Sequence, residues 1–239
     1  MSNERSAPTF HGMTVKGFTP PLKLSDFKLI AFDMDSTLIN IECIDEIADA
    51  AGRKAEVAAI TEAAMRGEIA DYKDSLRRRV ALLKGVTVAH MEEVLNHRLQ
   101  LNPGAENLVK ACQIAGMKVL LVSGGFTFFT DHVRDRLNIN WTRSNVLEVV
   151  HGELTGRMVA QAWGDICDGE EKRKMLLETC AQMGIQPTQA IAMGDGANDL
   201  PMMGVAGLSV AYHAKPKVRE QAMVAIEEGG LDRLLEVFN

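Results

Sequence analysis

Cysteine is scarce in this sequence, and its spacing excludes the common zinc and redox motifs. The cysteines are Cys43, Cys112, Cys167 and Cys180, and no two of them form a Cys-x-x-Cys pair. A disulfide or zinc framework usually shows closely and regularly spaced cysteines. We therefore expect four separate, reduced thiols.

Excess positive charge and long apolar runs are also missing. The chain has 26 lysine and arginine residues against 32 acidic ones, a formal net charge of −6, which gives no reason to expect a nucleic-acid partner. No stretch of about 20 apolar residues offers a membrane span. Residues 1–27 also lack the continuous apolar core of a signal peptide. We expect a cytoplasmic protein with no nucleic-acid or membrane partner, in which residues 1–27 form a loosely structured leader.

The most informative stretch is Leu29–Asn40. Its apolar start, Leu29–Phe32, predicts a strand that is buried on both faces of a sheet. Asp33 and Asp35 follow, and alternation along an extended chain points both carboxylates to the same side, just past the strand end. Ligands bind at that place in open α/β sheets, and two neighbouring acids need a cation or a shared proton. An Asp-rich turn is the alternative, and this stretch alone does not decide between them.

The next part of the chain, Glu42–Leu101, is helical in character. Apolar residues recur at helical spacing, and glycines interrupt the pattern where helices would end. This predicts three or four short helices, inserted as a compact cap over residues 41–102. Asn102-Pro103-Gly104 marks the return to a core made of residues 28–40 and 103–239.

A second strand, Lys118–Val122, is followed by a glycine-rich turn, Ser123-Gly124-Gly125-Phe126, and then by a helix. The glycines let the backbone approach a ligand, and amides at a helix N-terminus suit a phosphate group. Ser123 adds a hydroxyl group. Beyond this helix, residues 145–162 alternate imperfectly around turn signals, which predicts a β-hairpin.

Two further stretches complete the pattern. A predicted helix begins at Gly169 and carries three successive cations, Lys172, Arg173 and Lys174. Such a run is typical of a solvated face, although one cation near the helix start could reach a phosphoryl group, and position alone does not choose among them.

The strand Ala190–Met193 is followed by Gly194-Asp195-Gly196-Ala197-Asn198-Asp199. Acids beside a phosphate site require a hard cation such as Mg²⁺, whereas the plain alternative is a solvent-exposed turn.

In order, these four stretches resemble the motifs of the haloacid dehalogenase superfamily, and more closely those of its phosphoserine phosphatase family. The resemblance extends from about Lys28 to the C-terminus. It implies an α/β fold, with a Rossmann-type doubly wound parallel sheet as the core and a small inserted helical cap.

The resemblance also implies roles for individual residues. Asp33 is expected to attack phosphorus and Asp35 to act as general acid and then general base. Mg²⁺ is expected on Asp33, the Asp35 backbone carbonyl and Asp195, with Asp199 supporting them. The implied phosphate-binding residues are Ser123, Gly124, Lys172 and Asn198.

Substrate selection is expected to lie in the cap. The resemblance places Glu42 against the ammonium group of phosphoserine and Arg79 against its carboxylate, with Met65 and Tyr72 as an apolar wall. Tyr72 stands where this family often has phenylalanine. Taken alone, Glu42 also suits a helix N-terminus, and Arg79 belongs to an arginine run of a kind that is usually solvated.

The expected activity is Mg²⁺-dependent hydrolysis of O-phospho-L-serine through an aspartyl-phosphate, the last step of serine biosynthesis, by a monomer or homodimer. Alternatives are another phosphomonoesterase, a phosphotransferase, or a noncatalytic phosphate-binding protein. The joint presence of Asp33, Asp35 and Lys172 argues against the noncatalytic alternative, because binding needs neither a nucleophile nor a general acid.

Overall fold

Short apolar runs form the strands of a central sheet. The computed structural model describes residues 10–66, 68–69 and 71–239, and within them eight strands are arranged in the order β1-β8-β7-β6-β2-β3-β4-β5. The strands from β8 to β4 run parallel, whereas the edge strands β1 and β5 are antiparallel to their neighbours. The central strands are β2 (Leu29–Phe32), β3 (Lys118–Phe126), β6 (Ala190–Gly194) and β7 (Leu208–Tyr212).

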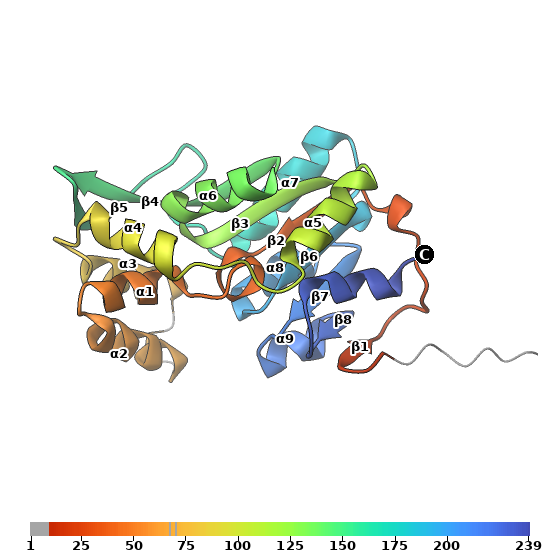
Figure 1. Ribbon diagram of the computed structural model, residues 1–239, viewed down its shortest axis with the longest axis horizontal. Coiled ribbons are helices and arrows are strands. Elements are labelled where there is room, and N and C mark those ends of the chain that lie inside the picture. Colours follow the sequence, from red (N-terminus) through yellow and green to blue (C-terminus); the bar gives the residue numbers. More distant parts are fainter. Residues whose placement is uncertain (1–9, 67, 70) are drawn as a thin grey trace, which may run out of the picture.

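Helices cover both faces of this sheet (Figure 1). Alternate residues of β2 belong to two different apolar clusters: Ile30 and Phe32 face one, Leu29 and Ala31 the other. The first cluster is closed by α5 (Ala105–Ile114), α6 (Thr127–Leu137) and the 3-10 helix η5 (Leu231–Val237). The second is closed by α7 (Gly169–Met183), α8 (Leu200–Met203) and α9 (Pro216–Gln221). The predicted doubly wound α/β core is confirmed.

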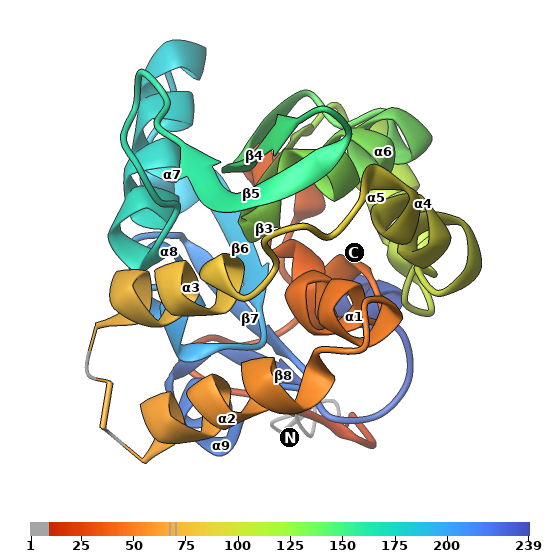
Figure 2. The ribbon, with the colours of Figure 1, turned by 90° about the vertical axis from the view of Figure 1, so that its left-hand side faces the viewer.

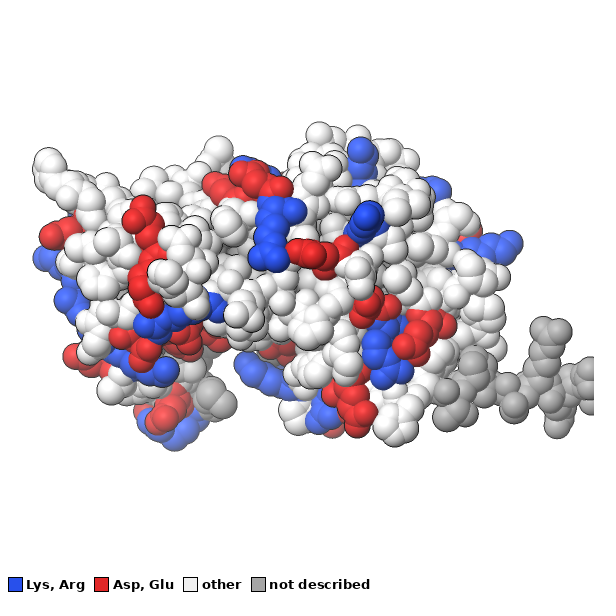
Figure 3. All heavy atoms as spheres, viewed as in Figure 1, with Lys and Arg blue, Asp and Glu red and all other residues white. Residues whose placement is uncertain are grey.

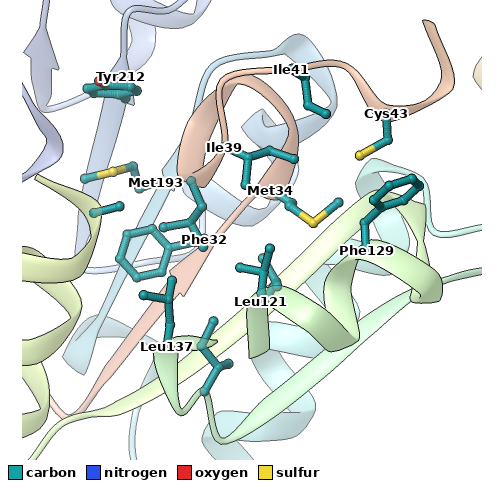
Figure 4. Packing of buried hydrophobic residues seen from close by; sticks show 14 of the residues in the cluster. Phe32, Met34, Ile39, Ile41, Cys43, Leu121, Phe129, Leu137, Met193 and Tyr212 are labelled. Atoms are coloured by element: carbon teal, nitrogen blue, oxygen red, sulfur yellow. The ribbon is translucent and has the colours of Figure 1, made fainter. Parts of the chain in front are cut away.

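The first cluster also holds the turn that follows β2. Figure 4 shows Met34 and Ile39 of this turn packed near Phe32 and Leu121, with Phe129 of α6 beside them. Met34 is fully buried although Asp33 and Asp35 flank it. The core therefore holds the backbone on which the two carboxylates are mounted.

The segment before β2 differs from the expected loose leader. Residues 1–9 lie outside the described residues, but β1 (Met13–Val15) pairs antiparallel with β8 (Val224–Ile226). Met13 is buried there, and Leu22 forms a bridge to Phe238. The pairing with β1 supplies the backbone partners that the edge of β8 would otherwise lack. Strands of three residues are too short to produce a periodic signal in the sequence.

Strand β3 also differs from expectation, because it continues through Ser123-Gly124-Gly125 to Phe126 instead of ending at Val122. Its register with β4 shifts between Val122 and Phe126. The glycines are therefore part of an irregular extended segment, and α6 begins at Thr127. This places Gly124 on the strand beside β2, where it borders the same cavity as Asp33.

Among the α-helices between β2 and β3, the four that precede α5 are called the cap: α1 (Cys43–Ala50), α2 (Lys54–Met65), α3 (Tyr72–Ala81) and α4 (Val88–His97). Figure 2 views them in front of the strands. The two connections between cap and core are paired with each other: Ile39 forms a bridge with Leu101, and Asn102 Nδ2 donates to the carbonyl oxygens of Thr37 (2.8 Å) and Ile39 (2.9 Å). The chain thus leaves and re-enters the core at one place.

The cap has a second attachment, to the predicted hairpin formed by β4 (Trp141–Val150) and β5 (Glu153–Val159). Between α3 and α4, the Gly85 amide donates to the Leu154 carbonyl (2.8 Å) and the Leu154 amide donates to the Val86 carbonyl (2.7 Å). The Val88 amide donates to the Gly152 carbonyl (2.9 Å). The hairpin therefore extends the core sheet onto the cap. Among the described residues, no helix combines the length and apolar character required to cross a bilayer.

Two glycines of the hairpin test its packing against the cap. Gly152 and Gly156 both have positive φ, but a Cβ at Gly152 would meet no atom within 4 Å, whereas one at Gly156 would lie 3.0 Å from the Ala81 carbonyl oxygen. We expect Gly152→Ala to lower the free energy of unfolding by about 1 kcal/mol through backbone strain alone. Gly156→Ala should cost roughly twice as much, because it adds a close contact to the same strain. Urea unfolding of both variants measures the two losses in free energy of unfolding. Equal losses would show that the hairpin is not closely packed against the cap at Gly156.

Candidate active site

The end of β2 presents two carboxylates to one cavity. The Asp33 amide donates to the Met193 carbonyl (3.0 Å), which continues the ladder between β2 and β6, and the Met34 amide donates to Asp33 Oδ1 (2.7 Å). Met34 points into the core while Asp33 and Asp35 border the cavity. The alternation predicted for these residues is confirmed. Ser36 then adopts a left-handed backbone (φ 56°), which turns the chain away from the sheet.

A fully buried ammonium group connects Asp33 to the loop after β6. Lys172 Nζ lies 2.7 Å from Asp33 Oδ1 and 2.7 Å from Asp199 Oδ1. Burial opposes the charge on Lys172, but the two carboxylates outweigh it and raise the pKa of the lysine above its ordinary value. Of the three cations in this part of α7, Lys172 alone is buried; Arg173 and Lys174 have about half of their side-chain surface exposed. The structure thus singles out the lysine that the resemblance selected.

The loop after β6 is folded around Asp199. Its Oδ2 accepts hydrogen bonds from the amides of Asp195 (3.1 Å) and Gly196 (3.0 Å), while its Oδ1 faces Lys172. A Cβ at Gly194 would lie 2.4 Å from the Asp199 carboxyl carbon, so a side chain at position 194 would displace that carboxylate. Asp199 therefore sets the shape of the loop that carries Asp195.

Three acids in this region have the geometry of a metal site. Asp33, Asp195 and Asp199 can each offer an oxygen atom such that all three oxygens lie within 4.8 Å of one another. Burial and the charge of Asp199 raise the pKa of Asp195 to about 6, and the same causes raise that of Asp33 although Lys172 opposes them. A divalent cation relieves such crowding, and clustered carboxylate oxygens are the ligands that hard cations prefer. The residues present therefore fit a divalent metal.

Asp35 has a different environment from that of Asp33. Its Oδ2 accepts a hydrogen bond from the Cys43 amide (3.0 Å), and its Oδ1 accepts one from the Cys43 thiol (3.3 Å). Burial and the nearby charge of Glu42 raise the pKa of Asp35 to about 7, against the effect of the Cys43 hydrogen bonds. Such a carboxyl group can both donate and accept a proton near neutral pH. Glu42 is held in place by Ser36, whose hydroxyl donates to Glu42 Oε1 (2.7 Å).

The glycine-rich end of β3 lies beside these acids. Ser123 is fully buried, and its Oγ accepts a hydrogen bond from the Gly125 amide (2.9 Å). A Cβ at Gly124 would lie 2.2 Å from the Tyr72 hydroxyl oxygen. The Tyr72 side chain of the cap helix α3 thus approaches the turn so closely that a side chain at position 124 would displace it.

The cavity between cap and core has a volume of about 660 Å³. In the space-filling view, the surface is notched between the part that carries α1 and α2 and the part that carries α9 (Figure 3). Lys172 lies beneath the cavity, in contact with Asp33, and the side chain of Met65 lies outside the described part of the chain. The other predicted site residues all line this one cavity: Asp33, Asp35, Glu42, Tyr72, Arg79, Ser123, Gly124, Asp195 and Asn198.

The arginine run in α3 divides between two environments. Arg77 pairs with Asp165 and Arg78 with Asp74, both at exposed positions. Arg79 lines the cavity, and its buried Nε has no hydrogen-bond partner among the described residues. The solvated alternative therefore describes Arg77 and Arg78 but not Arg79.

Sequence reasoning missed three residues of this region. Cys43 donates hydrogen bonds to the Asp35 carboxylate, and Asn145 donates to the backbone of Gly124. Lys215 lines the cavity, and its charge partly opposes the rise in the pKa of Asp195. Cys43 directly follows Glu42, which is the one local signal it offered. Asn145 is the first residue of the predicted hairpin, and a polar residue at that place is only a weak signal of a buried hydrogen-bonding role.

Comparisons with known proteins agree with this geometry. The family model of the haloacid dehalogenase-like hydrolases matches residues 30–204. This is more than half of the chain, and the protein belongs to that family of hydrolases.

Individual relatives narrow the class. A phosphoserine phosphatase from Polaromonas sp. is 81% identical over 95% of this chain and 96% of its own, and one from Albidiferax ferrireducens is 74% identical with the same coverage. A solved structure described as a phospho-aspartyl intermediate analogue of phosphoserine phosphatase aligns with a TM-score of 0.81 at 38% identity, over 89% of this chain and 99% of that one. The protein belongs to the phosphoserine phosphatase family.

The buried ion pairs predict a large effect of removing one charge. Lys172→Met leaves Asp33 and Asp199 buried without their cation, so we expect the free energy of unfolding in excess chelator to fall by about 3–5 kcal/mol. Adding Asp199→Asn should restore part of this loss, because it removes one of the two unpaired charges. Urea unfolding provides the measurement, and Lys174→Met, on the exposed side of the same helix, is the control. A loss no larger than that of the control would contradict the assigned role of the buried ammonium.

Proposed function

We propose that the protein hydrolyses O-phospho-L-serine to L-serine and phosphate in the cytoplasm, as the last step of serine biosynthesis, with Mg²⁺ as cofactor. The observation that carries the proposal is the placement of Asp33 and Asp35 in one cavity with Ser123, Glu42 and Arg79. The names of the similar proteins support the choice of substrate.

The chemistry begins at Asp33. Its free carboxylate oxygen attacks phosphorus, forming an aspartyl-phosphate while the bond between phosphorus and the serine oxygen breaks. Asp35 gives its proton to the departing serine oxygen. In the second half, Asp35 takes a proton from the water that cleaves the aspartyl-phosphate, and Asp33 is regenerated. The raised pKa of Asp35, about 7, suits both directions of this transfer.

Lys172 has two roles in this scheme. At 2.7 Å from Asp33 it favours the ionised form of the buried nucleophile, and its remaining donor capacity is available to a phosphoryl oxygen. Ser123, the Gly124 amide and Asn198 supply further donors around the phosphoryl group. A well-placed donor of this kind contributes about 3 kcal/mol of transition-state stabilisation.

Asp33, Asp195 and the Asp35 backbone carbonyl would hold Mg²⁺, with Asp199 fixing the loop that carries Asp195. When bound, the metal neutralises carboxylate and phosphoryl oxygens so that two anions can approach each other. The protein's own contribution is to keep these oxygens together in a buried site although they repel each other. This repulsion, together with burial, raises the pKa values of Asp33 and Asp195.

The cap provides selection among phosphate esters. Glu42 faces the substrate ammonium, and the guanidinium of Arg79 pairs with the substrate carboxylate, for which its paired donors are suited. Tyr72 forms an apolar wall of the cavity. In this division, residues 41–102 select the substrate and residues 28–40 and 103–239 perform the chemistry, within a monomer or homodimer.

The experiment that tests the function is phosphate release from L-phosphoserine with Mg²⁺ and with excess chelator, beside phosphothreonine, phosphoethanolamine and an aryl phosphate. We expect Mg²⁺-dependent release with a strong preference for phosphoserine. Asp33→Asn is the matched control, because it removes the nucleophile with almost no change of shape and should abolish turnover without unfolding. Equal rates on all four esters would reject the substrate assignment, and wild-type turnover by Asp33→Asn would reject the nucleophile.

Arg79 allows a separate test of substrate selection. Arg79→Ala should lower kcat/KM for phosphoserine by about 100-fold or more, because a charge-assisted, paired contact with the carboxylate is lost. Activity on the aryl phosphate, which lacks that carboxylate, should largely remain. Arg78→Ala, in the same helix but paired with Asp74 at the surface, is the control. Equal loss on both substrates would place Arg79 at the phosphate or in the scaffold.

A further inference from the structure

Asn145, in the middle of β4, is a buried amide with both ends occupied. Its side chain is 1% exposed. Its Nδ2 donates to the Gly124 carbonyl (2.8 Å), and its Oδ1 accepts from the Cys167 amide (2.8 Å). No resemblance or motif singles this residue out, and it does not line the cavity. Its partners, however, belong to two segments that border the reacting groups.

The first of these segments is the phosphate-binding turn. The Gly124–Gly125 peptide group is held at both ends, since its carbonyl accepts from Asn145 and its N–H donates to Ser123 Oγ (2.9 Å). Rotation of this peptide, which two glycines would otherwise permit freely, is therefore blocked. Because Ser123 Oγ already accepts one hydrogen bond, the direction of its own hydroxyl hydrogen is restricted. No described residue accepts that hydrogen, which leaves it for a ligand in the cavity.

The second segment leads into α7. Cys167 directly precedes Asp168, the N-cap of this helix, whose carboxylate accepts from the Glu171 amide (2.9 Å). The Lys172 amide donates to the Asp168 carbonyl (2.9 Å). By holding the Cys167 amide, Asn145 fixes the start of the helix that carries the Lys172 ammonium. One side chain thus links the start of the helix that carries Lys172 to the turn that carries the Ser123 hydroxyl.

We propose that Asn145 is a positioning residue for phosphoryl transfer, which aligns the Ser123 hydroxyl and Lys172 through the Gly124–Gly125 peptide and the start of α7. The inference rests on the proposed function in one respect, because it takes the phosphoryl group to bind at Ser123 and Lys172. An amide is required here, since it alone among side chains of this size donates with one end and accepts with the other. Aspartate keeps the acceptor and loses the donor.

The variants that test this are Asn145→Ala, Asn145→Asp, Ser123→Ala and the double variant Ser123→Ala/Asn145→Ala, assayed on an aryl phosphate as well as on phosphoserine. We expect Asn145→Ala and Asn145→Asp to lower kcat by roughly 10- to 100-fold, somewhat less than the loss of a direct donor. Because Asn145 acts partly through Ser123, the double variant should be far less impaired than the product of the two single effects.

A matched control lies one residue away. Ser144 of β4 shares a buried hydrogen bond with Thr130 (2.8 Å between the hydroxyl oxygens), and neither residue lines the cavity. Ser144→Ala removes a side-chain hydrogen bond of β4 that is about as buried as those of Asn145. It should change kcat by less than about twofold, even if Ser144→Ala and Asn145→Ala both lose stability. If Ser144→Ala slows turnover as much as Asn145→Ala, the role of Asn145 is structural only.

Two further outcomes would overturn the inference. The first is a loss of kcat in the double variant equal to the product of the losses in Ser123→Ala and Asn145→Ala. The second is wild-type kcat in Asn145→Asp, which is also the variant to use if Asn145→Ala does not fold. The aryl phosphate separates this inference from the proposed function, because its hydrolysis does not depend on contacts to the amino acid. If the wild-type protein hydrolyses only the aryl ester, the substrate assignment fails while the same variants still test Asn145.

Discussion

The arrangement of this active site depends on one buried cation. The Lys172 ammonium lies between Asp33 at the end of β2 and Asp199 in the loop after β6, with no exposed surface of its own. A charge placed there is tolerable only if both carboxylates are within hydrogen-bonding distance. The same contact therefore helps to fix the position of α7 relative to the sheet and the shape of the loop that carries Asp195, and it favours the ionised form of Asp33.

This contact leaves negative charge in excess, since one lysine directly contacts a site that holds several carboxylates. For a chain with a net charge of −6 to bind an anion at this site, a further positive charge has to be present there. In the proposed function, a divalent cation would supply this charge where Asp33, Asp195 and Asp199 converge, and hydroxyl and amide donors would bind the phosphoryl group on the other side. Attraction for the phosphate is therefore local and does not need a basic surface.

The sequence predicted the parts of the site that are formed by residues close to one another along the chain. Leu29–Phe32 followed by Asp33 and Asp35 indicated both the strand and its chemistry, because burial and alternation are local properties. The extension of β3 through Gly124 was not foreseen, since paired glycines usually signal a turn, and the register shift with β4 depends on the partner strand. Asn145 was missed for a similar reason. Its importance lies in Gly124 and Cys167, which are distant in sequence and adjacent only after folding.

The paired connections at Ile39 and Leu101 have a consequence for how such proteins diversify. Because the chain leaves and returns at one point, the inserted segment is tied to the core at its two ends and, beyond them, by its hydrogen bonds to the β4–β5 hairpin. The entropy of closing that loop grows slowly with its length, so segments of other lengths and sequences can replace these helices while the register of β2 with β3 and β6 stays unchanged. Under the proposed division of roles, the reaction would then be insulated from changes in substrate range, and the two could evolve as separate traits.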